Sequence, residues 1–212
     1  MIFKAVIALA IGYLLGSIPS AYIIGRLIKG IDIRRVGGGN MGALNVAREI
    51  GLLPGLAILF ADVAKGAIPV LIARWLGLPL IWIFVAGFAA VIGHNWPVFL
   101  GFKGGKGAAT TIGVLFALVP KEFAISLAII VIVLVITSNV RLAVVVGLSA
   151  LPIIVWQLDG SGMIIVYSLA LFLFLIVRSI PTTREALAKV GNKKNLILDR
   201  DYHFWQARKN KE

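Results

Sequence analysis

The chain has 212 residues, of which 60% are hydrophobic and only 14% are charged, and its mean hydropathy is +1.00. An ordinary soluble domain carries about 25% charged residues, so this composition excludes a soluble globular fold and predicts a protein that faces lipid. The absence of cysteine excludes disulfides and Cys-based metal sites, and two histidines are too few for a structural zinc site. The net charge of +12 indicates basic cytoplasmic loops facing anionic headgroups rather than a nucleic-acid partner. We therefore predict no metal, no cofactor and no nucleic acid.

Apolar runs predict the membrane-spanning helices, each of which needs about 20 residues. Such runs occur at 3–28, 52–76, 79–100, 121–138, 140–158 and 161–180. The first run stays apolar beyond the length of a signal peptide and lacks a clear cleavage site, so we interpret it as a spanning helix. A shorter run, 107–119, predicts a short or half helix packed inside protein. The expected fold is an all-α polytopic membrane protein with about seven transmembrane helices.

Loop charges predict the orientation. If seven helices are counted, the basic segments 29–51, 101–106, 139–141 and 181–212 all lie on one side, whereas six helices would divide them between two faces. The positive-inside rule then places these segments in the cytoplasm and the N-terminus outside. We predict a helical bundle over 1–180 and a basic cytoplasmic tail over 181–212, in the inner (plasma) membrane.

A first polar, glycine-rich segment covers 36–48. Its glycines formally match G-x-G-x-x-G, but no strand precedes them and there is no βαβ unit, so the dinucleotide interpretation is excluded. We predict a loop whose bare backbone approaches an anion closely. Asn40 and Asn45 add side-chain donors, and Arg48 adds a planar fork suited to phosphate. The alternative is an interhelical turn with an arginine that reaches the headgroups.

A second such segment covers 93–111 and leads directly into a predicted helix start. Its spacing is not that of a Walker A loop. Lys103 and Lys106 alternate with the glycines Gly104 and Gly105, so backbone amides, lysine charge and the helix dipole together favour phosphate binding. The alternative is ordinary positive charge on a cytoplasmic loop.

Three ionisable residues stand out near the predicted membrane interior. His94 suits a general base near neutral pH, or equally a hydrogen-bonding residue that positions the loop. Asp62 and Lys65 lie three apart on one helix face, where an internal ion pair is expected to support the site. His203, in the tail, is expected to lie at the membrane interface. The sequence has no Ser-His-Asp elbow, no H-E-x-x-H and no carboxylate cluster for magnesium.

These segments resemble the bacterial acyl-phosphate-dependent glycerol-3-phosphate acyltransferase family (the PlsY type). The stretch from Gly93 to Thr110 is similar throughout to the family motif G-H-x-[FWY]-P-x-x-x-x-F-K-G-G-K-G-x-A-T. The segment 38–45 resembles S-G-N-x-G-A-T-N, with Gly38 in place of serine and Leu44 in place of threonine. The D-x-x-K-G stretch that begins at Asp62 and the residues Gly16-Ser17-Ile18-Pro19 also look like the family. The resemblance covers about residues 10–180 and implies a seven-helix fold.

The chain departs from the family pattern elsewhere. The turn at 139–143 lacks the family's serine, and no H-R-x-N-I-like third motif is recognisable at 178–183. The His and Asn of that motif would have helped to bind substrate. Asn192, Asn195 or Arg141 are candidates to compensate for them.

The resemblance implies transfer of a fatty acyl group from acyl phosphate to the 1-hydroxyl of glycerol 3-phosphate, giving lysophosphatidic acid and phosphate. Acyl phosphate has a good leaving group, so holding two reactants together suffices without a covalent intermediate. The implied site, facing the cytoplasm beside membrane lipids, has the following residues: catalytic His94, Asn40 and Lys106; substrate-binding Asn45, Arg48, Lys103, Gly104, Gly105 and Arg141. Two alternatives remain, an acyltransferase with another polyol-phosphate acceptor and a non-enzymatic lipid-binding or transport protein on the same fold.

Overall fold

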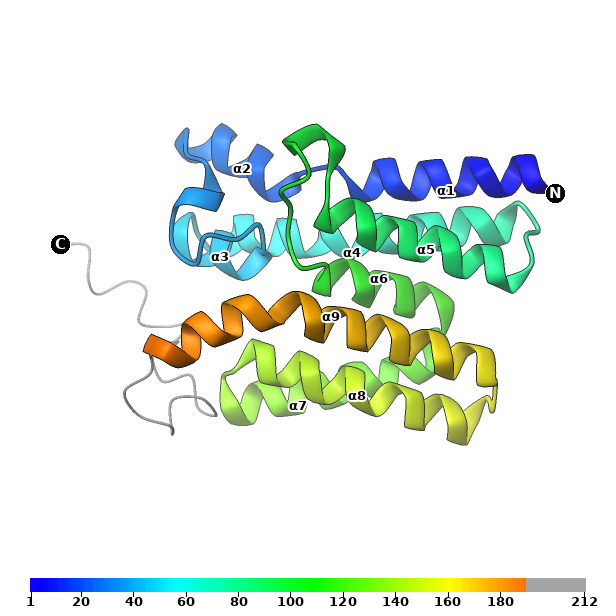
Figure 1. Ribbon diagram of the computed structural model, residues 1–212. Helices are drawn as coiled ribbons and strands as arrows, with labels where there is room; N and C mark the ends of the chain where they lie inside the picture. Colours follow the sequence, from blue (N-terminus) through cyan, green and yellow to red (C-terminus); the bar gives the residue numbers. More distant parts are fainter. Residues whose placement is uncertain (190–212) are drawn as a thin grey trace. The chain divides into compact units, whose positions relative to one another are not determined.

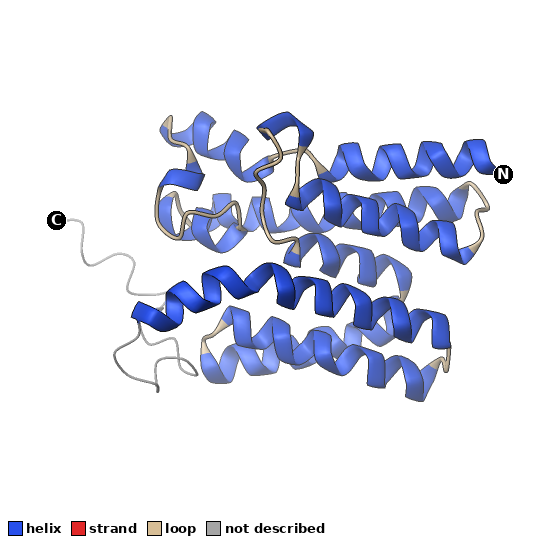
Figure 2. Cartoon of the chain, viewed as in Figure 1, coloured by secondary structure: helices blue, strands red, loops and turns tan. Residues whose placement is uncertain are grey.

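The structure, a computed structural model, describes the backbone of residues 1–189 and the side chains up to residue 181. Within that part of the chain the regular elements are all helical, which confirms the all-α prediction (Figure 2). The α-helices are α1 (Ile2–Gly16), α2 (Ser20–Lys29), α3 (Ala43–Glu49), α4 (Leu52–Trp75), α5 (Leu80–Asn95), α6 (Ala108–Leu118), α7 (Pro120–Thr137), α8 (Val140–Leu158) and α9 (Gly162–Lys189), and η1 (Ile33–Arg35) and η2 (Val98–Leu100) are single 3-10 turns. Asn192, Asn195 and His203 lie outside the described residues.

Six segments of the described chain are long and apolar enough to cross a membrane, and α6 is a shorter apolar helix. This matches the expected six long runs and one short helix, and it makes the protein a multi-pass membrane protein. α9 continues past Pro181 to Lys189, so the proposed boundary between bundle and tail falls inside a helix and stays a prediction.

The chain divides into two compact units, Met1–Pro120 and the residues from Lys121 onward. In the first unit α1 packs along α5, α4 packs along α6, and α4 also contacts α1, α3 and α5 (Figure 1). In the second unit α8 packs against α9, and the Ser126 hydroxyl of α7 donates to the Gly147 carbonyl of α8 at 2.8 Å. Such interhelical bonds suit a setting where lipid supplies no hydrogen-bond partners.

The first span differs from the single helix predicted over 3–28, because it breaks between α1 and α2 (Figure 1). Pro19 has no N–H and disfavours helical geometry at the residue before it. The Ile18 carbonyl at the break accepts hydrogen bonds from the Ser20 amide at 3.0 Å and from the Lys65 ammonium of α4 at 3.0 Å. Backbone groups freed within a membrane need protein partners, and Lys65 supplies one.

The first polar segment is also more structured than the predicted loop over 36–48. Its second half forms the short helix α3, so Asn45 and Arg48 lie on a helix and the loop itself is confined to 36–42. A buried apolar cluster anchors this region, and its members are Ala21, Ile33, Met41, Val46 and Ile58. The glycine-rich loop is therefore held in place by packed apolar side chains.

Two glycines allow α4 and α6 to approach closely. A Cβ added at Gly66 of α4 would lie 2.0 Å from the Thr110 carbonyl oxygen, and one at Gly113 of α6 would lie 1.9 Å from the Val63 carbonyl oxygen. Small residues at helix interfaces in membranes allow this kind of backbone contact. Since α6 follows directly after the second polar loop, this contact fixes where that loop ends.

We expect Gly113→Ala to destabilise the first unit by about 1–3 kcal/mol, because the two helices must separate to admit the methyl group. Thermal unfolding in detergent measures the change. Gly162→Ala is the matched control, since a Cβ there meets nothing within 4 Å. Equal melting temperatures for Gly113→Ala and the wild type would show that α4 and α6 do not pack this tightly.

Candidate active site

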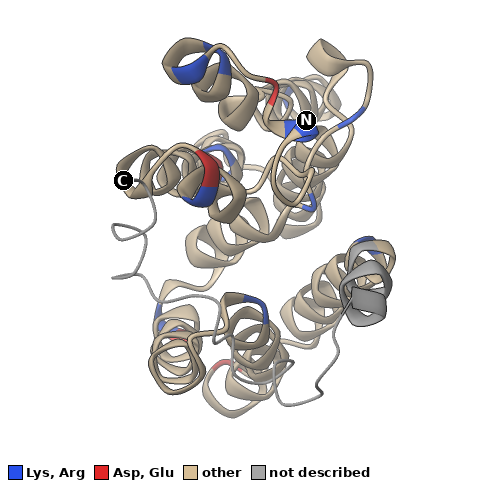
Figure 3. Cartoon of the chain, turned by 90° about the vertical axis from the view of Figure 1, so that its left-hand side faces the viewer, with Lys and Arg blue, Asp and Glu red and all other residues tan. Residues whose placement is uncertain are grey.

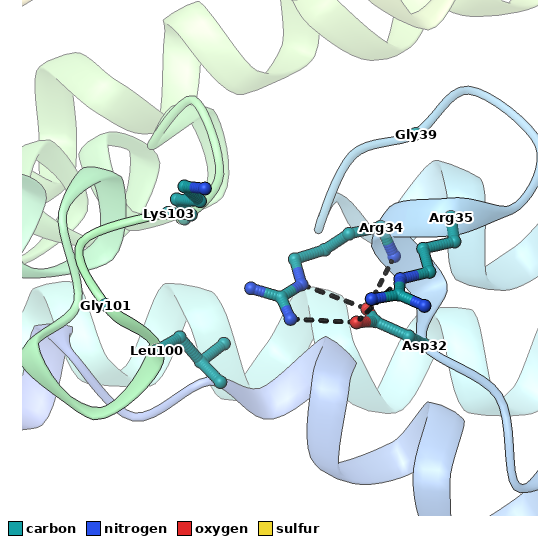
Figure 4. A pocket seen from close by; sticks show the side chains of 8 residues that line it. Asp32, Arg34, Arg35, Gly39, Leu100, Gly101 and Lys103 are labelled. Atoms are coloured by element: carbon teal, nitrogen blue, oxygen red, sulfur yellow. Dashed lines mark hydrogen bonds and ion pairs between the residues drawn. The ribbon is translucent and has the colours of Figure 1, made fainter.

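The two polar loops meet at an open pocket of about 570 Å³ in the first unit (Figure 4). One wall comes from η1 and the first glycine loop, and the other from the loop that follows α5. The lining residues are Asp32, Arg34, Arg35, Gly39, Leu100, Gly101, Lys103 and Gly104. The structure thus brings together two segments that lie more than 50 residues apart and that the sequence predicted on one side of the membrane. Figure 3 shows the chain from the left-hand side of Figure 1, with the Lys and Arg positions in blue and the Asp and Glu positions in red.

Asn45 holds the first loop in shape. Its side chain is 3% exposed. Its Oδ1 accepts a hydrogen bond from the Gly38 amide at 2.8 Å, and its Nδ2 donates to the carbonyls of Ile33, Val36 and Asn40 at 3.1, 3.2 and 3.0 Å. An Asn side chain offers two donors and two acceptor positions, and the hydrogen bonds of Asn45 described above all go to backbone groups. The geometry therefore favours a loop-shaping role over the direct substrate contact predicted for it.

Asn40 makes a local turn at the tip of the same loop. Its Oδ1 accepts from the Gly42 amide at 3.0 Å and its Nδ2 donates to the Gly38 carbonyl at 3.2 Å. Gly39 has a φ of +64°, in the left-handed region that favours glycine. Asn40 is half-buried and Arg48 is exposed on α3, and neither belongs to the described lining of the pocket. Their roles in catalysis and binding stay predictions.

The second loop folds back on the end of α5. The Gly104 amide donates to the Asn95 carbonyl at 3.2 Å, and the Gly105 amide donates to the His94 carbonyl at 3.1 Å. A Cβ at Gly105 would lie 2.1 Å from the His94 Nε2, so only glycine lets the loop lie this close. Because both amides donate to carbonyls of the chain, the structure favours lysine side chains over these amides as the anion-binding groups of this loop.

The two lysines take different positions in that loop. Lys103 is exposed and lines the pocket, whereas Lys106 is half-buried and lies outside its described lining. Gly107, with a φ of +87°, is the N-cap residue of α6. The predicted helix start directly after the lysine–glycine run is therefore confirmed.

His94 lies beneath this loop and is 6% exposed. Its Nδ1 is 3.9 Å from Asp62 Oδ1, and the Lys65 ammonium is 2.9 Å from the same oxygen. The ion pair expected between Asp62 and Lys65 is therefore present, at 2% and 7% exposure. With Asp62 on one side of the imidazole and Gly105 on the other, the geometry favours the positioning role of the two left open for His94.

The sequence interpretation missed part of the pocket, since it treated 29–51, which contains Arg34 and Arg35, only as a basic loop. Arg34 donates from Nε and Nη2 to the Asp32 carboxylate at 3.0 and 2.8 Å, and its backbone N–H donates to Asp32 at 3.1 Å. The hydrogen bond from the Arg34 side chain lowers the pKa of Asp32 to about 2, so the carboxylate is ionised at neutral pH. The D-x-R spacing at the start of η1 is the signal from which this pair was predictable.

Comparison with known proteins places the chain in a family. The family model described as glycerol-3-phosphate acyltransferase matches residues 6–189. The chain belongs to the glycerol-3-phosphate acyltransferase family. Glycerol-3-phosphate acyltransferase 1 of Dehalococcoides mccartyi is 43% identical over 91% of this chain and 95% of its own length. The corresponding protein of Geotalea daltonii is 43% identical over 81% of this chain and 89% of its own.

Solved structures agree with the family assignment. The crystal structure of PlsY (YgiH), an integral membrane glycerol 3-phosphate acyltransferase in its glycerol 3-phosphate form, is 34% identical, with a TM-score of 0.80 over 87% of this chain and 92% of that one. The lysophosphatidic acid form gives 33% and 0.78 over the same shares. The predicted membership of the PlsY-type family and the predicted membrane fold are both confirmed.

One predicted binding residue of this acyltransferase lies in the second unit. Arg141 is exposed in the first turn of α8, where the Asn139 side chain accepts from the Leu142 amide at 3.1 Å. A cation at a helix N-terminus opposes the helix dipole, so Arg141 is not there to stabilise α8. Its role in substrate binding stays a prediction.

Proposed function

We propose that this chain transfers a fatty acyl group from acyl phosphate to the 1-hydroxyl of glycerol 3-phosphate, with its active site on the cytoplasmic face of the inner membrane. The protein is a membrane glycerol-3-phosphate acyltransferase that forms lysophosphatidic acid, as its family and its relatives indicate. The parts that we propose beyond this are acyl phosphate as the donor, the inner membrane as the location and the cytoplasmic face as the side of the active site. The family match favours this activity over the transport and lipid-binding alternatives.

The observation that carries the site assignment is the pocket between the two polar loops. Its described lining holds three cationic side chains, Arg34, Arg35 and Lys103, against one carboxylate, Asp32. Both substrates of the proposed reaction carry phosphate, and such a lining attracts phosphate. The apolar surfaces of the spanning helices suit the acyl chain, which remains in the hydrocarbon region while its reactive end meets the loops.

The reaction needs few specialised groups. The acceptor hydroxyl attacks the acyl carbon, the bond from that carbon to the phosphate oxygen breaks, and phosphate departs with its electron pair. The proton of the attacking hydroxyl is lost in the same step and is taken up by the departing phosphate. We assign Lys103 and Lys106 to the phosphate charge, and Arg48 with Asn40 to the second phosphate or to the developing oxyanion. Asn45, Gly104 and Gly105 shape the two loops that carry these groups. Holding both reactants in line lowers the barrier by about 7–11 kcal/mol in favourable cases.

We expect purified protein to convert palmitoyl phosphate and labelled glycerol 3-phosphate to lysophosphatidic acid, and Lys106→Ala to lower the rate about 100-fold or more, because a charge that stabilises the transition state is lost. Product analysis by thin-layer chromatography measures both. Lys121→Ala is the matched control, since Lys121 is an exposed lysine at the start of α7. Turnover with coenzyme A or carrier-protein thioesters but not with palmitoyl phosphate would contradict the proposed donor. Wild-type activity in Lys106→Ala would contradict the role of that lysine.

A further inference from the structure

The Arg34 side chain is held in one orientation by two neighbours. Its Nε and Nη2 donate side-on to the Asp32 carboxylate at 3.0 and 2.8 Å, and its guanidinium carbon lies 5.2 Å from the centre of the Tyr22 ring. Asp32 is 8% exposed, whereas the Arg34 side chain is 29% exposed. The carboxylate of the pair is therefore buried, whereas the arginine side chain reaches solvent.

This arrangement leaves part of the guanidinium directed at the pocket. A guanidinium has five N–H donors, and the Asp32 carboxylate takes the edge formed by Nε and Nη2. Figure 4 shows the remaining terminal nitrogen of Arg34 pointing away from Asp32, toward the loop of Leu100 and Gly101. An arginine fixed this way loses little side-chain entropy when it binds a ligand, because its neighbours have already ordered it.

The excess of positive charge around the pocket favours binding of an anion. Arg35 and Lys103 are exposed and line the same pocket as Arg34. Asp32 offsets one of these three positive charges, and Arg35 Nε is 3.9 Å from its Oδ2. Like charges gathered around one pocket repel each other, and a bound dianion removes that cost. A pair that served only to hold η1 in place would not require two further cations around the same space.

We propose that Arg34 binds a substrate phosphate dianion in this pocket and that Asp32 is the positioning residue that aims it. The proposal rests on the proposed function and adds to it a phosphate-binding residue that the loop motifs do not contain. The ligand chemistry is a phosphate monoester or acyl phosphate dianion, held by the free edge of Arg34 with Lys103 on the facing wall. Its source is either the acyl donor or glycerol 3-phosphate.

The kinetic test compares the KM of each substrate in Arg34→Ala, Arg34→Lys and Asp32→Asn. We expect Arg34→Ala to raise the KM of one phosphate substrate about 10- to 100-fold, the range for a lost hydrogen bond to a charged group, with kcat within about threefold. The substrate affected identifies the source of the phosphate. Arg34→Lys keeps the charge but loses the fork, so its KM should be intermediate. Asp32→Asn keeps the size of the side chain but offers Arg34 one acceptor oxygen in place of two, so the guanidinium loses its fixed orientation. The KM for the same substrate should therefore rise, though less than in Arg34→Ala.

A binding test works without turnover, so it separates failure of this proposal from failure of the proposed reaction. We expect inorganic phosphate, compared with chloride at equal ionic strength, to raise the melting temperature of the wild type but not of Arg34→Ala. Arg26→Ala is the matched control, because Arg26 lies 5.3 Å from the same Tyr22 ring, bonds to Tyr22 and Gly30, and does not belong to the described lining of the pocket. If Arg34→Ala does not fold, Arg34→Lys provides both readouts.

Two results would overturn the proposal. One is an unchanged KM for both substrates in Arg34→Ala while Lys103→Ala raises one of them. The other is an equal phosphate-induced rise in melting temperature in Arg34→Ala and the wild type. Equal effects of Arg34→Ala and Asp32→Asn on stability, with no effect on either KM, would identify the pair as a purely structural one.

Discussion

Replacement of His94 by alanine is expected to lower kcat about 100-fold, with a smaller effect on either KM. The imidazole lies between Asp62 Oδ1, at 3.9 Å from Nδ1, and the backbone of Gly105. Its removal leaves a space under the loop that carries Lys103 and Lys106, and a displacement of about 1 Å at a reacting centre costs on the order of 100-fold in rate. Steady-state assays with each substrate varied in turn measure the change.

Two conservative variants separate the roles that the sequence left open. Gln places an amide near the position of Nε2, facing Gly105, and Asn places one near the position of Nδ1, facing Asp62. If His94 positions the loop, His94→Gln should recover a large part of the rate, and the pH profile of kcat/KM should keep its shape. If His94 is instead the general base, His94→Gln and His94→Asn should be as inactive as His94→Ala. The acid limb of the wild-type pH profile should then be absent from the profiles of all three variants.

The sequence predicted where the second loop ends better than it predicted the direction of the loop's amides. The run from Gly93 to Thr110 indicated both a phosphate-binding loop and a helix start, and α6 does begin at Ala108. The glycines were expected to expose amides to a ligand, yet the Gly104 and Gly105 amides bond back to α5. Motif spacing reveals which residues form a loop, but the direction of an N–H depends on the carbonyls that tertiary packing brings near it.

The break in the first span shows a similar limit. Hydropathy sums over 3–28 gave one long apolar segment, because a proline and a serine hardly change the mean. Pro19 is a local signal for a break, but the side-chain partner that the Ile18 carbonyl gains there, Lys65, is 47 residues away. Asp62 and Lys65 were predictable as a pair since they lie three apart on one helix. The link from Lys65 to α1 was not predictable, because no local pattern encodes it.

The pocket itself was the part that sequence analysis could not assemble. Arg34 and Lys103 are 69 residues apart, and each alone satisfies the positive-inside rule. The rule explains why basic residues occur on these loops but not why three of them surround one space. Their common position around the pocket is the observation that favours the proposed binding site over a solvated, basic membrane face.

Substitutions that break the buried Asp62–Lys65 pair are expected to cause large losses of stability. Removing one partner leaves a buried, uncompensated charge, which costs about 3–5 kcal/mol. Asp62→Leu and Lys65→Met should each destabilise the first unit by that amount, measured by unfolding in detergent against the wild type. Lys65→Met leaves the Ile18 carbonyl with the Ser20 amide as a partner, so the lost charge compensation should dominate its effect.

The double variant Asp62→Leu/Lys65→Met should recover most of the lost stability, because replacing a whole buried pair by apolar residues of similar size is often neutral or stabilising. The activity of the double variant then shows whether the pair only stabilises the fold or also supports catalysis. Asp62 also faces the His94 Nδ1, so we expect the stable double variant to remain about tenfold less active than the wild type, through a misplaced imidazole and loop. Full activity would mean that the pair serves the fold alone. A double variant as unstable as the singles would mean that the ammonium of Lys65 is required at the break between α1 and α2, whatever its partner.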